Sequence, residues 1–146
     1  MVAGIDEAGL GPLLGPLTLG YAALRLPPRK LNVWEALSEV VSRDPKLDAE
    51  HLVVADSKRV FSRNPRGERR LESTALCFLG AGDAGRPRSG ADLLRSTPTQ
   101  LRPRAGDIAR SPWYAELPTE LPVWVDAGRL ELRPVSYTHL RAHETV

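Results

Sequence analysis

Two adjacent carboxylates near the start of the chain, Asp6 and Glu7, are the residues best suited to chemistry. They follow a short apolar run, residues 2–5, and precede a turn rich in glycine and proline. A carboxylate next to buried sequence needs a partner for its charge, because burying it unpaired is costly. Hard divalent cations such as Mg²⁺ take carboxylate oxygens as ligands. The pair therefore predicts a metal-dependent enzyme.

The turn that follows decides whether the two carboxylates can act together. Side chains alternate between the two faces of a strand, so Asp6 and Glu7 reach one ion only if the strand ends or bends at Glu7. Gly9 and Gly11 supply that backbone freedom. Their uncovered N–H groups can also approach a phosphate or a sugar hydroxyl.

A second constellation, Asp56-Ser57-Lys58, closes an apolar run over residues 51–55. An acceptor, a hydroxyl and an ammonium group in sequence are suited to contact a phosphate backbone, with Lys58 as the cation. The alternative is structural, because Asp-Ser is also an ordinary turn or helix-cap pair.

Taken together, the two motifs resemble the ribonuclease HII family. The match covers Gly-Ile-Asp-Glu-Ala-Gly-x-Gly-Pro-x-x-Gly-Pro within residues 4–17, and Asp-Ser-Lys at 56–58. The resemblance implies an α/β protein with an RNase H-like fold, a mixed sheet with flanking helices. It also implies a ribonuclease H type 2, an endonuclease that cleaves RNA in RNA–DNA hybrids and in duplex DNA containing ribonucleotides.

The resemblance also assigns roles to individual residues. Asp6 and Glu7 would be the catalytic residues and would hold Mg²⁺ or Mn²⁺, which activates water and stabilises charge on the phosphate. Gly9, Leu10 and Gly11 would lie near the ribonucleotide, where the 2′-hydroxyl distinguishes RNA from DNA. Ser57 and Lys58 would hold nearby phosphates.

Leucine stands at position 10 where the family usually has arginine, which leaves other functions open. One alternative is a non-catalytic nucleic-acid-binding relative of the same fold. Another is a different phosphate-handling enzyme that shares only the glycine-rich turn. Nothing in the sequence identifies a protein partner.

The family needs further carboxylates from later strands, and Asp126 is the candidate for one of these metal ligands. It follows Val-Trp-Val at 123–125, which could form one more strand. The residues around it match the family poorly, and aspartate is common in turns. At Asp126 we favour a turn residue over a ligand.

The elements that must position these residues are indicated by hydrophobic spacing and by capping residues. Residues 2–5 and 17–24 predict strands joined as an antiparallel hairpin with a wide turn, the first of them buried. Residues 31–43 predict a helix capped by Asn32.

The sequence predicts a longer helix after Asn64, which would cap it, with Pro65 in its first turn and Gly80 at its end. Helical spacing puts four residues on its apolar face: Leu71, Ala75, Phe78 and Leu79.

Composition bounds the class of protein. A single cysteine, Cys77, excludes an internal disulfide and is typical of the cytoplasm.

Residues 59–104 carry ten basic and four acidic side chains, which suits a polyanionic partner or, alternatively, a solvated arginine-rich loop. The uncharged stretch 8–24 contains Pro12, Pro16 and four glycines, so we expect no membrane contact.

We expect residues 1–134 to form a partial RNase HII-like domain, with residues 80–112 as a flexible insertion. Residues 135–146 are similar to a tail that read-through of sequencing-adapter DNA adds to unrelated predicted proteins, and we interpret them as an artefact. We therefore expect an incomplete sheet, and a chain that is inactive alone because it lacks the later carboxylates.

Overall fold

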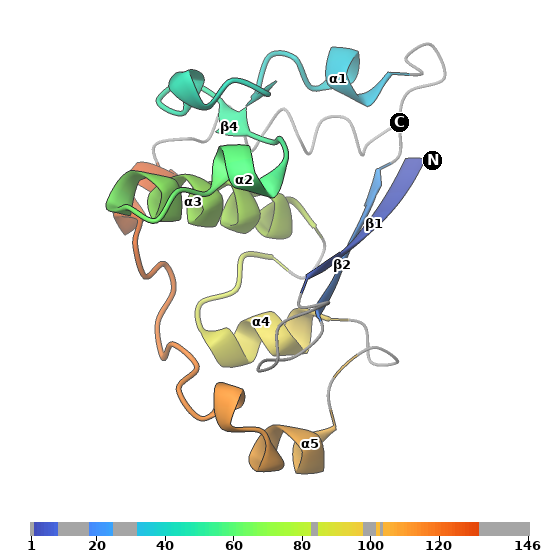
Figure 1. The fold of residues 1–146 in the computed structure, drawn as a ribbon, viewed down its shortest axis with the longest axis vertical. Helices are drawn as coiled ribbons and strands as arrows, with labels where there is room; N and C mark the ends of the chain where they lie inside the picture. Colours follow the sequence, from blue (N-terminus) through green and yellow to red (C-terminus); the bar gives the residue numbers. More distant parts are fainter. Residues whose placement is uncertain are drawn as a thin grey trace.

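The computed structural model describes residues 2–8, 18–24, 32–82, 85–97, 102 and 104–131. Within these residues the protein is mixed α/β, as Figure 1 shows. The elements are β1 (Val2–Ala8), β2 (Thr18–Leu24), α1 (Val33–Ala36), β3 (Val41–Ser42), η1 (Pro45–Leu47), β4 (Leu52–Val53), α2 (Ser57–Val60), α3 (Pro65–Ala81), α4 (Gly90–Ser96), α5 (Ala105–Arg110), η2 (Pro112–Tyr114) and α6 (Ala127–Glu131).

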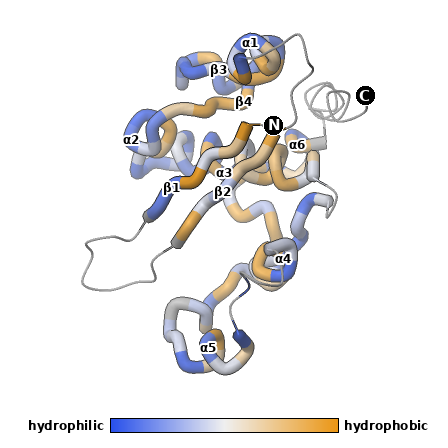
Figure 2. Tube along the Cα trace, turned by 90° about the vertical axis from the view of Figure 1, so that its right-hand side faces the viewer, coloured by the Kyte–Doolittle hydropathy of each residue, from blue (hydrophilic) through white to orange (hydrophobic). Residues whose placement is uncertain are grey.

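The predicted antiparallel hairpin is confirmed, and its strands are β1 and β2. The expectation that the first strand is buried is wrong: Ile5 is 78% exposed, and Tyr21, directly opposite it, is 53% exposed. No third strand of the described residues pairs with the hairpin. Figure 2 shows hydrophobic residues along both strands, and Ile5, Leu19 and Tyr21 among them are exposed. Half-buried Leu24 packs against the core.

The helix predicted over 31–43 is much shorter, because the chain turns at Leu37 and becomes extended. α1 is capped as predicted by Asn32, whose side chain accepts from the N–H of Trp34 at 3.0 Å. Val41 then pairs with Leu52 across the parallel strands β3 and β4. β-branched valines at 40 and 41 suit this extended backbone better than a helix.

The helix predicted after Asn64 is confirmed as α3, with Pro65 in its first turn and Asn64 as its N-cap. The Asn64 side chain accepts from the N–H of Gly67 at 2.9 Å. A side chain at residue 67 would clash, because a Cβ there would lie 2.2 Å from the carbonyl oxygen of Ser62. The predicted end at Gly80 is wrong: the helix runs on to Gly82, its C-cap.

The predicted apolar face of α3 is confirmed at Phe78, which packs against the core, and is wrong at Leu71, Ala75 and Leu79, which are exposed. Leu71 is 45% and Leu79 36% exposed, whereas Leu76 and Cys77 are buried. Buried Cys77 is a core residue, and it carries no disulfide. The buried face of α3 packs against β4 and the turn before β3, in a core made of Leu37, Val40, Val41, Leu52, Leu76, Cys77, Ala81, Val125 and Leu130.

The strand predicted at 123–125 does not form, because the backbone N–H groups there bind a side chain. Glu72, 6% exposed in the middle of α3, accepts from the N–H groups of Val123, Trp124 and Val125 at 2.6, 2.7 and 2.8 Å. We call this arrangement the Glu72 clamp. It satisfies three backbone donors that a strand would have paired with a neighbour.

Residues 85–131 extend away from the core through α4 and α5, then return to it at α6 (Figure 1). α4 lies within the stretch predicted to be a flexible insertion, and is joined to the returning chain by the Gly90 N–H, which donates to Pro118 O at 2.8 Å. α5 was not predicted. None of the described helices combines the length and apolar character needed to span a membrane.

Candidate functional site

The carboxylate pair lies inside β1 rather than at its end. Asp6 is paired with Gly20 and Glu7 with Leu19, and the strand continues to Ala8. Consecutive residues of a strand point to opposite faces, so the two carboxylates lie on different sides of the hairpin. Both residues are exposed, and Asp6 Oδ1 accepts from the N–H of Glu7 at 3.0 Å.

This geometry does not fit a single ion shared by Asp6 and Glu7. The condition that the strand end or bend at Glu7 is not met, because β1 and β2 remain paired past that residue. Within the described ranges no three His, Cys, Asp or Glu side chains come together as a metal-binding group. Gly9, Leu10 and Gly11 lie outside the described residues, as does the tail at 135–146.

Asp56, Ser57 and Lys58 form the start of α2, immediately after β4. Asp56 is the N-cap, and its carboxylate accepts from the N–H of Lys58 at 2.9 Å. The helix-cap alternative for Asp-Ser is therefore confirmed. Ser57 and Lys58 are exposed, and their side chains bind no other residue in the described part of the chain. They remain accessible to a phosphate.

The sequence favoured a turn residue at Asp126, and the structure places it at the start of α6 as a capping residue. Its Oδ1 accepts from the N–H of Arg129 at 3.2 Å, in the first turn of α6. The Glu72 clamp holds the three residues just before it. The described structure brings no other carboxylate or histidine pair to Asp126 as a metal group.

Sequence reasoning missed a polar hollow between α3, the turn after η1 and the start of α6. Its volume is about 420 Å³. We call it the arginine hollow and define it by its charged and titratable lining: Asp48, His51, Arg66, Arg69, Arg70 and Arg129. The sequence signal was present in part, since 66, 69 and 70 are spaced to share one face of a helix.

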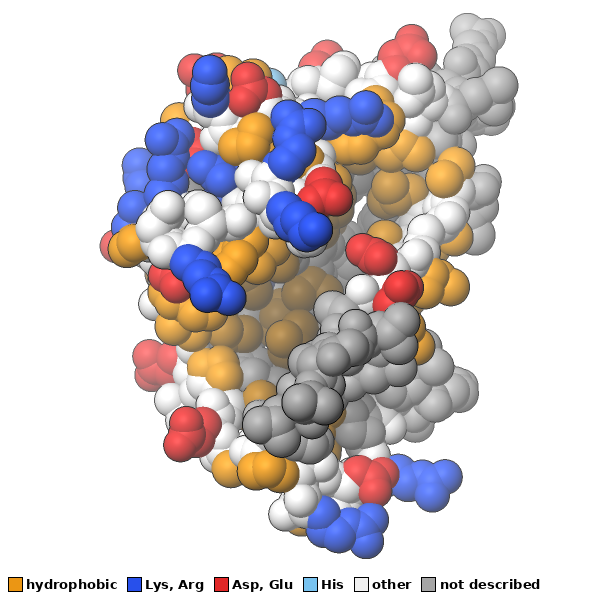
Figure 3. All heavy atoms as spheres, in the orientation of Figure 1, with side chains coloured by type: hydrophobic (Ala, Val, Ile, Leu, Met, Phe, Trp, Pro, Cys, Tyr) orange, Lys and Arg blue, Asp and Glu red, His pale blue; other side chains and the backbone are white. Residues whose placement is uncertain are grey.

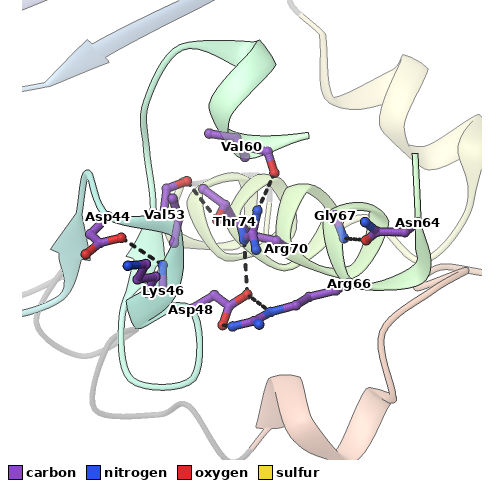
Figure 4. A network of polar contacts seen from close by, with 10 residues as sticks. All are labelled: Asp44, Lys46, Asp48, Val53, Val60, Asn64, Arg66, Gly67, Arg70 and Thr74. Atoms are coloured by element: carbon purple, nitrogen blue, oxygen red, sulfur yellow. Dashed lines mark hydrogen bonds and ion pairs between the residues drawn. The ribbon is translucent and has the colours of Figure 1, made fainter. Parts of the chain in front are cut away.

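Asp48 binds two of the arginines that line the hollow, Arg66 and Arg70, as Figure 4 shows. Its carboxylate accepts from Arg66 Nε at 2.9 Å and Nη2 at 2.8 Å, and from Arg70 Nε at 3.0 Å. Arg70 also donates to the Val60 carbonyl at 2.8 Å. The hydrogen bond from Arg66 is the main reason that the pKa of Asp48 is lowered; Arg70 adds to this, while partial burial opposes it.

Comparisons of this chain with protein-family models, with curated proteins and with solved structures find no match. The residues and their geometry therefore carry the functional argument.

Proposed function

We propose that this chain is a ribonuclease HII-like, metal-dependent endonuclease of RNase H-like fold that acts on RNA within RNA–DNA duplexes. The observation that carries the proposal is the pairing of the motif over residues 4–17 with Asp56-Ser57-Lys58. An antiparallel hairpin whose first strand contains residues 4–8 of the first motif supports it, as does a second motif at the start of a helix that follows a strand. The proposal places the activity in the cytoplasm.

The proposed cofactor is Mg²⁺ or Mn²⁺, with Asp6 and Glu7 as the first ligands. Asp126, where we favour a turn residue, is the weaker candidate for a further ligand. The hairpin in its described form does not present Asp6 and Glu7 to one ion. Asp126 is engaged as a helix cap. We therefore expect the chain alone to bind a hybrid without cleaving it, until further carboxylates complete the ligand set.

The proposed substrate contacts lie on both motifs. The backbone of Gly9, Leu10 and Gly11 would approach the ribonucleotide. Ser57 and Lys58 would contact phosphates, which their exposed and unpaired side chains permit. The substrate is then an RNA–DNA hybrid or a duplex DNA that contains ribonucleotides.

The deciding experiment measures cleavage of a labelled RNA–DNA hybrid with Mn²⁺, using the 146-residue chain and a form extended along its gene past Pro134. We expect cleavage only from the extended form, and its loss in Asp6→Asn and Glu7→Gln. Asp107→Asn, an exposed carboxylate on α5, is the matched control. Robust cleavage by the short chain that Asp6→Asn abolishes would contradict its inactivity. An extended form that cleaves equally well as Asp6→Asn would contradict the role of Asp6 as a metal ligand, and an extended form that does not cleave the hybrid would contradict the nuclease itself.

A non-catalytic nucleic-acid-binding relative is the second candidate. It is favoured by Leu10, which removes one cation from the predicted substrate contact, and by the opposite orientation of Asp6 and Glu7. The same assay separates the two functions. An extended form that binds the hybrid but shows no metal-dependent cleavage supports the binding protein.

A further inference from the structure

The arginine hollow has more positive charge than its own carboxylate balances. Four arginines line it, and Asp48 is its one acidic lining residue. Asp48 is already bound to Arg66 and Arg70. Arg69 and Arg129 are exposed, and neither forms an ion pair with another residue in the described ranges. Like charges held around one hollow repel each other, and an anion bound between them would offset that repulsion.

The hollow is also prepared for an oxyanion by the way its arginines are held. Asp48 fixes two guanidinium groups, one of which, Arg70, has a side chain only 9% exposed. Guanidinium groups fixed in this way lose little entropy when they donate to phosphate oxygens. Of these two arginines, Arg66 has a side chain that is 60% exposed, and it lines the same hollow as Arg69 and Arg129.

A basic surface continues from the hollow along the chain. Residues 57–71 carry six basic side chains and one acidic side chain, Glu68. Lys58, Arg59 and Arg63 in this stretch are all exposed. Figure 3 shows Lys and Arg side chains gathered over the part of the molecule that contains α2 and α3. A positive surface of this extent fits a row of phosphates better than it fits a single small anion.

We propose that the arginine hollow binds a backbone phosphate of a nucleic acid, at a site separate from the carboxylate pair on β1. Arg69 and Arg129, which have no counter-ion in the described structure, supply the attraction, and Arg66 lies beside them. The contact is to the phosphate and carries no base specificity. It does not depend on the cleavage activity proposed above.

The test is a fluorescence anisotropy titration of a short RNA–DNA hybrid at several salt concentrations. The variant is Arg69→Ala combined with Arg129→Ala. The control is Arg104→Ala combined with Arg110→Ala, which removes the same charge from exposed positions at α5. Each phosphate contact that is lost lowers the slope of log affinity against log salt by about one. The two arginines share one phosphate, so we expect a fall of about one in the variant, with affinity about tenfold weaker at low salt, and little change in the control.

Other measurements separate the alternatives. Arg69→Lys combined with Arg129→Lys keeps the charge and should restore most of the slope, which excludes misfolding as the cause. Equal losses in the variant and the control would overturn the proposal, because they would show an effect of net charge alone. The proposal would also be overturned if the variant bound the hybrid as well as the parent does but no longer bound inorganic phosphate. That result would show that the hollow binds a small phosphate and not a nucleic acid. The readout is binding and not cleavage, so a failed nuclease proposal would not be confused with a failed phosphate site.

Discussion

The β1–β2 hairpin and the body around α3 differ in how their side chains are used. The hairpin contains the start of the motif that suggests chemistry, yet its side chains Ile5, Leu19 and Tyr21 are exposed. The Asp6 carboxylate accepts a hydrogen bond from the backbone N–H of its neighbour, Glu7. The body around α3 contains the core, the Glu72 clamp and the arginine hollow. The most recognisable sequence therefore lies in the region that contributes least packing, and the strongest tertiary contacts lie where no motif pointed.

This difference has a physical origin. A two-stranded hairpin pairs only the backbone groups that face its partner strand, and by itself it has no second layer against which to bury an apolar face. α3 has such a layer in β4 and in the chain that returns at 123–130. Stability should therefore depend on α3 and its partners, whereas substitutions in the hairpin should act on function.

The largest difference in stability is expected between a substitution in the core and one in the hairpin. Leu52→Ala should lower the free energy of unfolding by about 3 kcal/mol, because Leu52 is 1% exposed and its removal leaves a cavity. Ile5→Ala should lower it by less than about 0.5 kcal/mol, because that side chain is largely in solvent. Urea unfolding of both variants measures the difference. Similar losses in the two would show that the hairpin is packed against another surface.

The Glu72 clamp provides the next test. Glu72→Ala should cost about 3 kcal/mol, because it leaves the buried N–H group of Val125 and the partly buried N–H groups of Val123 and Trp124 without acceptors. Glu116→Ala, at an exposed position, is the control and should have little effect. Hydrogen exchange should show faster exchange at 123–125 in the Glu72 variant. Protection that is unchanged at those amides would mean that Glu72 does not hold the segment.

The Asp48 carboxylate should matter less, and its effect should depend on pH. Asp48→Asn should cost about 2 kcal/mol at neutral pH, because it leaves the largely buried Arg70 without its partner. The pKa of Asp48 is lowered in the folded protein from its usual 3.8, so the stabilisation is present above that value and is lost as the pH falls through the folded pKa.

Urea unfolding from pH 7 to pH 2.5 checks this prediction. The difference in unfolding free energy between the parent and Asp48→Asn should become smaller below about pH 4. Asp107→Asn breaks an exposed pair with Arg110 and should cost less than about 0.5 kcal/mol at any pH. If the difference in unfolding free energy between the parent and Asp48→Asn stayed constant over the whole pH range, the ion pair would be ruled out as its source.

The smallest effect concerns the start of α3. Asn64→Ala should cost about 1 kcal/mol, because the N–H of Gly67 loses its acceptor. Asn64→Asp keeps the acceptor and should preserve stability. Thermal unfolding followed by circular dichroism compares the two variants. If both lose the same stability, Asn64 acts through a contact other than the cap.

Sequence reasoning was most successful where a structure is decided within a few residues. The hairpin, the cap at Asn32 and the start of α3 at Asn64-Pro65 were all predicted, because their signals are turn and capping residues next to the element itself. It failed at residues 37–43, where helical spacing of apolar residues was also compatible with a turn followed by a strand. It failed again for most of the apolar face of α3, since Leu71 and Leu79 are apolar yet exposed.

The sequence by itself determined the motif that predicts a nuclease, the hairpin that carries it and the capping residues of the helices, because each depends on neighbours in the chain. Only the tertiary structure decided that Glu72 binds the backbone at 123–125, more than fifty residues away. It likewise decided that Arg129 joins Arg66 and Arg69 around one hollow. Such contacts follow from how distant segments pack on a shared core, and no local spacing specifies that packing.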